Sequence, residues 1–193
     1  MFEYIKGSVI SLSPAGVVIE AGEIGYFIHI SLTTYSLLHG SEKGKLFLHQ
    51  VIREDAHILY GFFDQAEREL FRMLISVNGI GANTAIMMLS SHKPEELQHA
   101  ILNENVGLLK NIKGIGIKTA QRVIIDLKDK IGKTSAGDLL FRPDGSPVRS
   151  EAVSALDMLG FNKKAVEKLV DQVLIEQPAI TVENLIKLAL KSF

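Results

Sequence analysis

One sequence occurs twice in this chain, as Leu74-Ile-Ser-Val-Asn-Gly-Ile-Gly-Ala-Asn-Thr-Ala85 and, 35 positions later, as Leu109-Lys-Asn-Ile-Lys-Gly-Ile-Gly-Ile-Lys-Thr-Ala120. Leu, Gly-Ile-Gly and Thr-Ala coincide in the two copies. Each copy has the pattern of an apolar helix end, a tight glycine hairpin and the start of a second helix. The central Ile80 or Ile115 is expected to turn inward and lock the two helices together. The repeat therefore predicts two helical hairpins of one design.

Such a hairpin suits the phosphate of a nucleic acid. Glycine has no Cβ, so another molecule's backbone can approach it closely. The next helix begins at once, so the N–H groups of its first turn point outward at the positive end of the helix dipole. Contacts of this kind fix a protein on the DNA backbone without reading base sequence. For one copy alone, the alternative is that Gly79 or Gly114 is an ordinary C-terminal helix stop.

The presence of two copies favours DNA binding over that alternative. Each copy ends in Thr-Ala, and the second also carries Lys118 and Arg122. The pattern is typical of the helix-hairpin-helix, a DNA-binding motif that is not sequence-specific. Binding through helix termini also explains how a nearly neutral protein can hold DNA, because few basic side chains are then needed.

Composition sets the remaining limits. The 193 residues include 21 basic and 22 acidic side chains, a net charge of −1, so a strongly basic composition is absent. Apolar residues make up 47%, the usual share for a chain that buries a core. The lack of cysteine excludes disulfides, thiolate metal sites and a cysteine nucleophile. Glu3 and Lys6 interrupt the apolar run that a signal peptide needs, and no membrane span is apparent, so we expect a soluble, intracellular protein.

The chain divides into segments that differ in composition and in the spacing of their apolar residues. Residues 1–63, with a net charge of −2, read as five or six short strands separated by glycine turns, which suggests a small closed or nearly closed barrel. Residues 64–133 are helical in pattern and carry +2. Residues 134–147 have the composition of a flexible linker. Residues 148–193 read as three short helices, with Gly160 as a helix stop and N-caps at Asn162 and Thr181.

No catalytic or metal-binding constellation is apparent. Gly132-Lys133-Thr134 resembles the end of a nucleotide-binding P-loop, but Leu127 stands where the first glycine belongs and a helix precedes it instead of a strand. The six histidines are scattered without metal-ligand spacing. We therefore expect no catalytic residue, no metal and no cofactor in this chain.

As a whole, the chain resembles the RuvA family of Holliday-junction-binding proteins. The resemblance runs through essentially the full length and rests on both Gly-Ile-Gly hairpins, on Val51-Ile-Arg-Glu-Asp-Ala56 with Leu59-Tyr-Gly-Phe62, and on Glu151-Ala-Val-Ser-Ala-Leu-Asp-Met-Leu-Gly-Phe161. It implies a multidomain α+β protein. An N-terminal OB-fold β-barrel is expected over 1–63, an all-α double helix-hairpin-helix domain over 64–133, and a small C-terminal three-helix (UBA-like) domain over 148–193, after the linker.

The resemblance also implies a function. RuvA-like proteins bind four-way junction DNA, hold it open and planar, and recruit the hexameric RuvB ATPase for branch migration in recombination, DNA repair and the SOS response. They are not enzymes alone, because ATP and Mg²⁺ are used by the partner motor. The RuvC resolvase is a further partner. A homotetramer is implied, with one tetramer or a pair of them on the junction, in the bacterial cytoplasm and at the nucleoid during repair.

The resemblance assigns site residues to three groups. Glu54 and Asp55 match the acidic pin of the family, for which a solvated turn is the alternative. Leu156, Leu159 and Phe161 are the expected motor contacts, for which the core of the three-helix unit is the alternative. Asn83 stands where many relatives have Lys, so weaker phosphate contact is expected at the first hairpin. The predicted DNA contacts are Gly79, Ile80, Gly81, Asn83, Thr84, Gly114, Ile115, Gly116, Lys118, Thr119 and Arg122.

Two other classes of function compete with this hypothesis. A structure-specific nuclease or glycosylase built on the same hairpins would need a carboxylate cluster or a catalytic Asp or Lys, and Asp126 is the nearest candidate, within a helix. A protein-interaction adaptor would use the helix pairs to bind peptides and would show no DNA binding at low salt.

Overall fold

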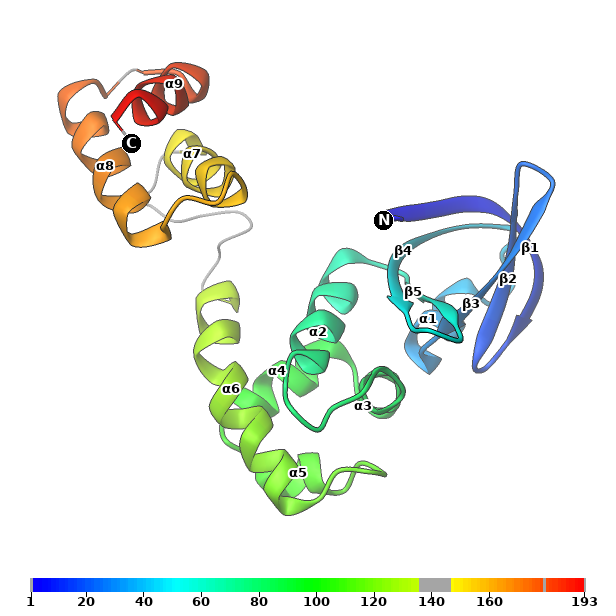
Figure 1. Ribbon diagram of the computed structural model, residues 1–193. Coiled ribbons are helices and arrows are strands. Elements are labelled where there is room, and N and C mark those ends of the chain that lie inside the picture. Colours follow the sequence, from blue (N-terminus) through cyan, green and yellow to red (C-terminus); the bar gives the residue numbers. More distant parts are fainter. Residues whose placement is uncertain (1, 136–146, 179, 193) are drawn as a thin grey trace. The chain divides into compact units, whose positions relative to one another are not determined.

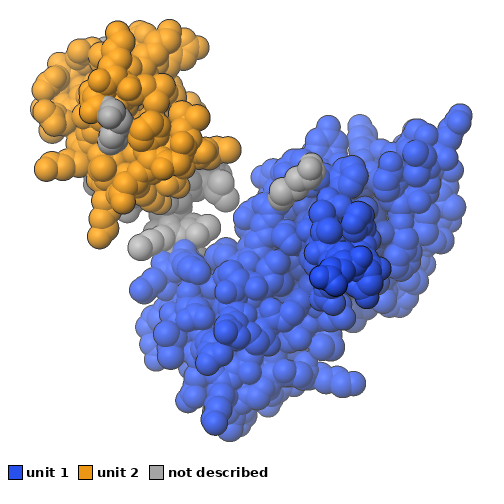
Figure 2. Space-filling model, in the orientation of Figure 1, with its two compact units in different colours: residues 1–135 blue, residues 136–193 orange. Residues whose placement is uncertain are grey.

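The computed structural model describes residues 2–135, 147–178 and 180–192 (Figure 1). The chain forms two compact units, Met1–Ser135 and Ala136–Phe193 (Figure 2). The predicted linker, 134–147, falls mostly on residues 136–146, which lie outside the described residues.

The first unit begins with the barrel that the strand pattern predicts. Its strands are β1 (Tyr4–Ser13), β2 (Gly16–Ala21), β3 (Ile24–Ile30), β4 (Lys43–Ile52) and β5 (His57–Phe62). They close in the order β1-β2-β3-β5-β4, with β1 and β4 paired, and only β3 and β5 are parallel. This is the expected OB-like barrel. Alternate apolar side chains fill it, because successive residues of a strand face opposite sides. The fully buried ones include Val17, Ile19, Ile28, Ile30, Leu46 and Leu48.

A short helix, α1 (Leu32–Leu38), connects β3 to β4 and was not expected from the sequence. Ser31 caps it by accepting a hydrogen bond from the Thr34 N–H, and Leu38 is buried at its end. Leu32 and Thr33 also form hydrogen bonds with the end of a helix about 57 residues further on, at Ser90 and Leu89. Four of its seven residues, Thr33, Thr34, Tyr35 and Ser36, are poor helix formers, so the cap and these distant contacts help to stabilise the helix.

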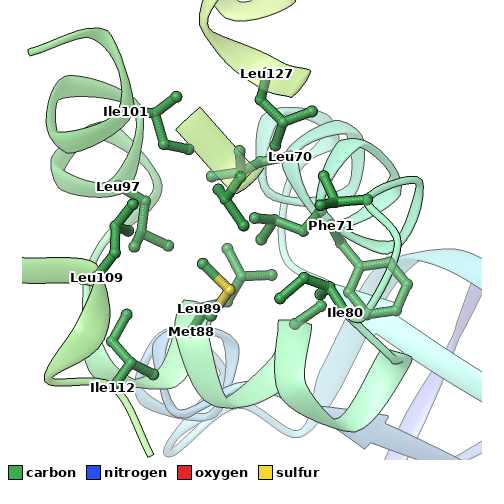
Figure 3. Packing of buried hydrophobic residues seen from close by; sticks show 14 of the residues in the cluster. Leu70, Phe71, Ile80, Met88, Leu89, Leu97, Ile101, Leu109, Ile112 and Leu127 are labelled. Atoms are coloured by element: carbon green, nitrogen blue, oxygen red, sulfur yellow. The ribbon is translucent and has the colours of Figure 1, made fainter. Parts of the chain in front are cut away.

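The remainder of the first unit is helical. Its elements are α2 (Gln65–Ile75), α3 (Ala82–Ser91), α4 (Pro94–Leu102), α5 (Val106–Lys110) and α6 (Ile117–Ser135). Their apolar faces meet in one core, part of which Figure 3 shows. Each copy of the repeat covers the end of one helix, a loop and the start of the next helix. The first copy runs from α2 into α3, and the second from α5 into α6. The tandem helix-hairpin-helix arrangement is thus confirmed.

The barrel and the helices of this unit share a core. Tyr60 and Phe62, at the end of β5, belong to the helical cluster, and both rings lie against Phe71 of α2, with centroids 5.3 and 4.8 Å away. A buried carboxylate adds hydrogen bonds between the barrel and the helices. Glu67 of α2 accepts hydrogen bonds from the hydroxyls of Ser31 and Thr34, on the barrel side. Burial raises the pKa of Glu67, although these two bonds oppose the rise.

The second unit consists of α7 (Pro147–Met158), α8 (Lys163–Glu176) and α9 (Val182–Ser192), as the pattern predicts. Gly160 has φ of +92° and ends α7, and the Asn162 side chain caps α8. Thr181 Oγ1 accepts from the Asn184 N–H at the start of α9. The small core contains Ala152, Val153, Leu156, Val166, Val170, Leu185 and Ala189.

Candidate nucleic-acid interface

The two repeats fold into hairpins with the same hydrogen bonds. The first hairpin comprises residues 76–81 and the second 111–116. In each, the N–H of the central isoleucine donates to the carbonyl three residues earlier, at Val77 or Ile112, over 3.0 Å. The next helix then begins with a bond from the alanine of Thr-Ala to the second glycine, at 3.0 and 2.9 Å. One sequence thus gives one local structure twice.

Ile80 and Ile115 support the hairpins from inside. Each side chain is only 5% exposed, and Ile80 lies among the packed side chains in Figure 3. Each backbone N–H is already used within its own hairpin. The prediction that both isoleucines turn inward is confirmed. Their inclusion among the DNA contacts does not fit this geometry, because neither the side chain nor the N–H faces outward.

The glycines have two different roles. Gly79 and Gly114 have φ of +96° and +90°, a conformation that side chains rarely adopt, so the turn itself requires them. Gly81 and Gly116 have no such requirement. A Cβ at either would meet nothing within 4 Å, and Gly81 has φ of −86°. A Cβ would fit at both, so packing against the rest of the chain does not require glycine there.

The starts of α3 and α6 are open to an anion. Gly81 is the N-cap of α3, and no side chain caps that first turn. Gly116 precedes α6 in the equivalent position, next to exposed Lys118 and half-buried Thr119. In both helices the uncapped N–H groups of the first turn lie at the positive end of the dipole. Each hairpin therefore presents backbone donors beside a bare glycine, an arrangement that suits phosphate.

Charge is distributed unequally between the hairpins. The second has exposed Lys118 and also Lys113, which the sequence reasoning missed, although it aligns with Asn78 of the first copy. Arg122 of α6 was assigned to the second hairpin, but its Nη1 donates to the carbonyl oxygen of Asn78, 3.3 Å away, in the first. This contact brings a cation of the second copy to the loop of the first.

Asn83 has a partner in the barrel. The Tyr60 hydroxyl donates to Asn83 Oδ1 over 3.1 Å, so the side chain at the start of α3 is held by β5. Asn83 is exposed and Thr84, next to it, is half-buried. Local sequence gave no sign of this contact, because the two residues are 23 positions apart.

Glu54 and Asp55 form the exposed tip of the β4–β5 hairpin. The Arg53 N–H donates to the Ala56 carbonyl over 2.8 Å and closes the turn beneath them. Within the described part of the chain, neither carboxylate takes part in an ion pair. Both negative charges therefore face solvent at the end of a two-stranded ribbon.

The three residues expected to contact a motor lie in different environments. Leu156 is fully buried in the core of the second unit, which is the alternative given for it above. Phe161 packs partly against that core. Leu159 is 60% exposed and is the only one of the three with a largely free side chain. The sequence reasoning missed Met158 beside it, which is 89% exposed.

The described residues form neither a metal centre nor a membrane-spanning helix. No group of three His, Asp or Glu side chains there could hold a metal ion. Among those residues, too, no helix is both long enough and apolar enough to cross a membrane.

Comparison with known proteins matches three family models in chain order. They are the RuvA N-terminal domain over residues 1–61, a SAM-like helix-hairpin-helix tandem over 71–129, and the RuvA C-terminal domain over 147–192. Three curated relatives bear the name Holliday junction branch migration complex subunit RuvA. Those of Christiangramia forsetii and Bacteroides thetaiotaomicron are 49% and 51% identical, with 99% of both chains covered in each case. That of Flavobacterium psychrophilum is 47% identical over 100% of both.

Proposed function

Because the chain belongs to the RuvA family, we propose that it binds four-way (Holliday) junction DNA as the non-catalytic, DNA-binding subunit of a branch migration complex. It holds the junction open while a partner motor moves the DNA arms, in recombination and repair.

One observation carries most of this proposal. Two hairpins with the same hydrogen bonds each place a glycine that the fold does not require, Gly81 or Gly116, beside an uncapped helix start. Two phosphate sites in one unit bind a duplex arm by its backbone alone, so binding is independent of sequence. Branch migration needs this independence, because the sequence at the crossing point changes at every step.

Selection of a junction over plain duplex is assigned to Glu54 and Asp55. Their carboxylates project at a hairpin tip and repel phosphate. In a homotetramer, two carboxylates from each of four copies would gather where the strands cross. Continuous duplex across that centre would bring its phosphates against them, whereas an open junction would not.

The partners proposed are the hexameric RuvB ATPase, with the RuvC resolvase as a further one. The contact with RuvB is assigned to the second unit, with Leu159 and Met158 among its exposed apolar side chains. A tether between the units would raise the effective concentration of the motor near bound DNA. ATP and Mg²⁺ are assigned to the motor and no cofactor to this chain. The proposed location is the bacterial cytoplasm, at the nucleoid during repair.

The deciding experiment is a fluorescence-anisotropy titration at two salt concentrations. It compares a synthetic four-way junction with a linear duplex of equal total length. Strong preference for the junction is the expected result. Equal binding of both would reduce the proposal to a general duplex-binding protein. Binding to neither at low salt would favour a peptide-binding adaptor, and metal-dependent cutting of the junction would favour a nuclease.

A further inference from the structure

Wherever the second copy of the repeat carries a cation, the aligned residue of the first copy is neutral. The second copy and the residue two positions beyond it supply four cations, and their counterparts in the first copy are neutral. The pairs, first copy before second, are Ile75 and Lys110, Asn78 and Lys113, Asn83 and Lys118, and Met87 and Arg122. The first hairpin thus contributes no charged side chain of its own. Apart from Arg122, which reaches the loop of the first hairpin from α6, side-chain contacts with a phosphate there depend on neutral donors, whose strength depends on orientation.

Asn83 is the neutral donor in the best position, and its orientation is fixed. It is the second residue of α3, exposed beside Gly81. Its Oδ1 accepts the hydroxyl proton of Tyr60 over 3.1 Å. Because the amide group is planar, holding the oxygen also sets the direction of Nδ2 and its two N–H donors. Among the described residues, Nδ2 has no hydrogen-bond partner.

Tyr60 is itself immobilised. It is 2% exposed, and its ring lies near His29 and Phe71, with centroids 5.6 and 5.3 Å away. Its backbone pairs with His29 on one side and His49 on the other. Burial raises the pKa of the Tyr60 hydroxyl above its ordinary value, so the O–H stays a donor throughout the neutral range.

We propose that Tyr60 is a positioning residue for DNA binding: the barrel hydroxyl holds Asn83 so that its amide N–H groups, together with the first turn of α3, meet a phosphate oxygen. The inference rests on the proposed function and deepens it. The neutral hairpin replaces the flexible charge of lysine with a donor that is oriented before binding, and so loses less side-chain freedom when DNA arrives.

The first test removes the hydroxyl alone. Tyr60→Phe is compared with Tyr26→Phe, which deletes another barrel hydroxyl that has no hydrogen bond in the described residues. Affinity for the four-way junction is measured by fluorescence anisotropy, with urea unfolding midpoints to verify folding. Tyr60→Phe is expected to weaken binding about fivefold, the value of one net hydrogen bond, and Tyr26→Phe to leave it unchanged. An unchanged affinity for Tyr60→Phe would overturn the inference.

A second test separates positioning from a general structural effect. In an Asn83→Lys background the donor is a cation that needs no orienting hydroxyl, so Tyr60→Phe should then have no effect on affinity. The Lys variant should also steepen the salt dependence, which Tyr60→Phe alone should not change. An equal loss in both backgrounds would show that Tyr60 acts through the fold and would overturn the proposed role.

Substitution of the exposed Asn83 keeps the inference testable if Tyr60→Phe is poorly folded. Asn83→Ala should lose the same fivefold as Tyr60→Phe, because both remove one oriented donor. The double variant should lose no more than either single one. Full affinity in Asn83→Ala would overturn the inference. Failure of the wild type to bind junction or duplex would instead remove the proposed function, and with it this role of Tyr60.

Discussion

Arg122 Nη1 donates a hydrogen bond to the carbonyl oxygen of Asn78, 3.3 Å away, and so joins α6 of the second repeat to the loop of the first. A carbonyl oxygen at a turn would otherwise face an approaching phosphate with its own negative partial charge. The guanidinium covers this oxygen and leaves a net positive charge beside the first hairpin. The two hairpins thus share a cation, although only one copy of the sequence encodes it.

Replacing Arg122 by Met, the residue at the equivalent position of the first copy, tests this sharing. Affinity for junction and for duplex should fall together, and the slope of log affinity against log salt should become shallower by about one per lost phosphate contact. Lys128→Met is the control, because Lys128 lies on the same helix but pairs with Glu104. An equal change of slope in both variants would show that only net charge matters.

Alanine at Gly81 or Gly116 should separate binding from folding. Neither position crowds a Cβ, so the free energy of unfolding, measured in urea, should stay within about 0.5 kcal/mol of wild type while DNA affinity falls about tenfold or more. Gly79→Ala is the contrasting variant, because its φ of +96° makes a side chain cost about 1–2 kcal/mol of stability. Unchanged affinity in Gly81→Ala and Gly116→Ala would argue against close approach of DNA at these glycines.

Neutralising the tip of the β4–β5 hairpin should change selectivity rather than stability. Glu54→Gln combined with Asp55→Asn is expected to raise affinity for linear duplex severalfold and so lower the ratio of junction to duplex binding. Glu23→Gln removes a carboxylate from another exposed turn of the barrel and should leave that ratio unchanged. The result that contradicts the assigned role is an equal gain for both DNA substrates.

The free energy of unfolding of the first unit should depend on pH because of the buried Glu67. Burial raises its pKa above the ordinary value of 4.5, so its stabilising effect is complete below that pH and is lost as pH rises through the folded-state pKa. Urea unfolding from pH 4 to 8 should therefore show wild type losing stability relative to Glu67→Gln as pH rises. A difference that is constant, or that moves the other way, would mean that the folded-state pKa is not raised. Glu67→Ala should cost about 3 kcal/mol at pH 4, because it leaves buried hydroxyls unpaired, and this cost should shrink as pH rises.

The sequence was most informative where structure depends on neighbours in the chain. The hairpins follow from glycines and apolar residues within twelve positions, and the inward side chains of Ile80 and Ile115 could be predicted from that spacing. Gly160 and Asn162 mark a helix boundary by the same kind of local rule. Such features need no knowledge of what packs against them.

Features that depend on distant contacts could not be predicted. Helix α1 has a run of poor helix formers at its centre, residues 33–36, and is stabilised because Ser31 caps it and α3 binds its start. The hydrogen bond from Tyr60 to Asn83 joins residues 23 positions apart. Leu156 and Leu159 are identical side chains three positions apart, and only the packing of the three helices determines that the first is buried and the second exposed.

The shared core of barrel and helices has a geometric consequence. Strand β5 starts just after the acidic tip and ends, at Tyr60 and Phe62, inside the core that also supports both hairpins. Folding therefore sets the distance between the exposed carboxylates and the two hairpins before any DNA is present. Under the proposed function, this fixed spacing admits a DNA whose phosphates reach the hairpins and leave the space at the tip empty, and it excludes a DNA that fills that space.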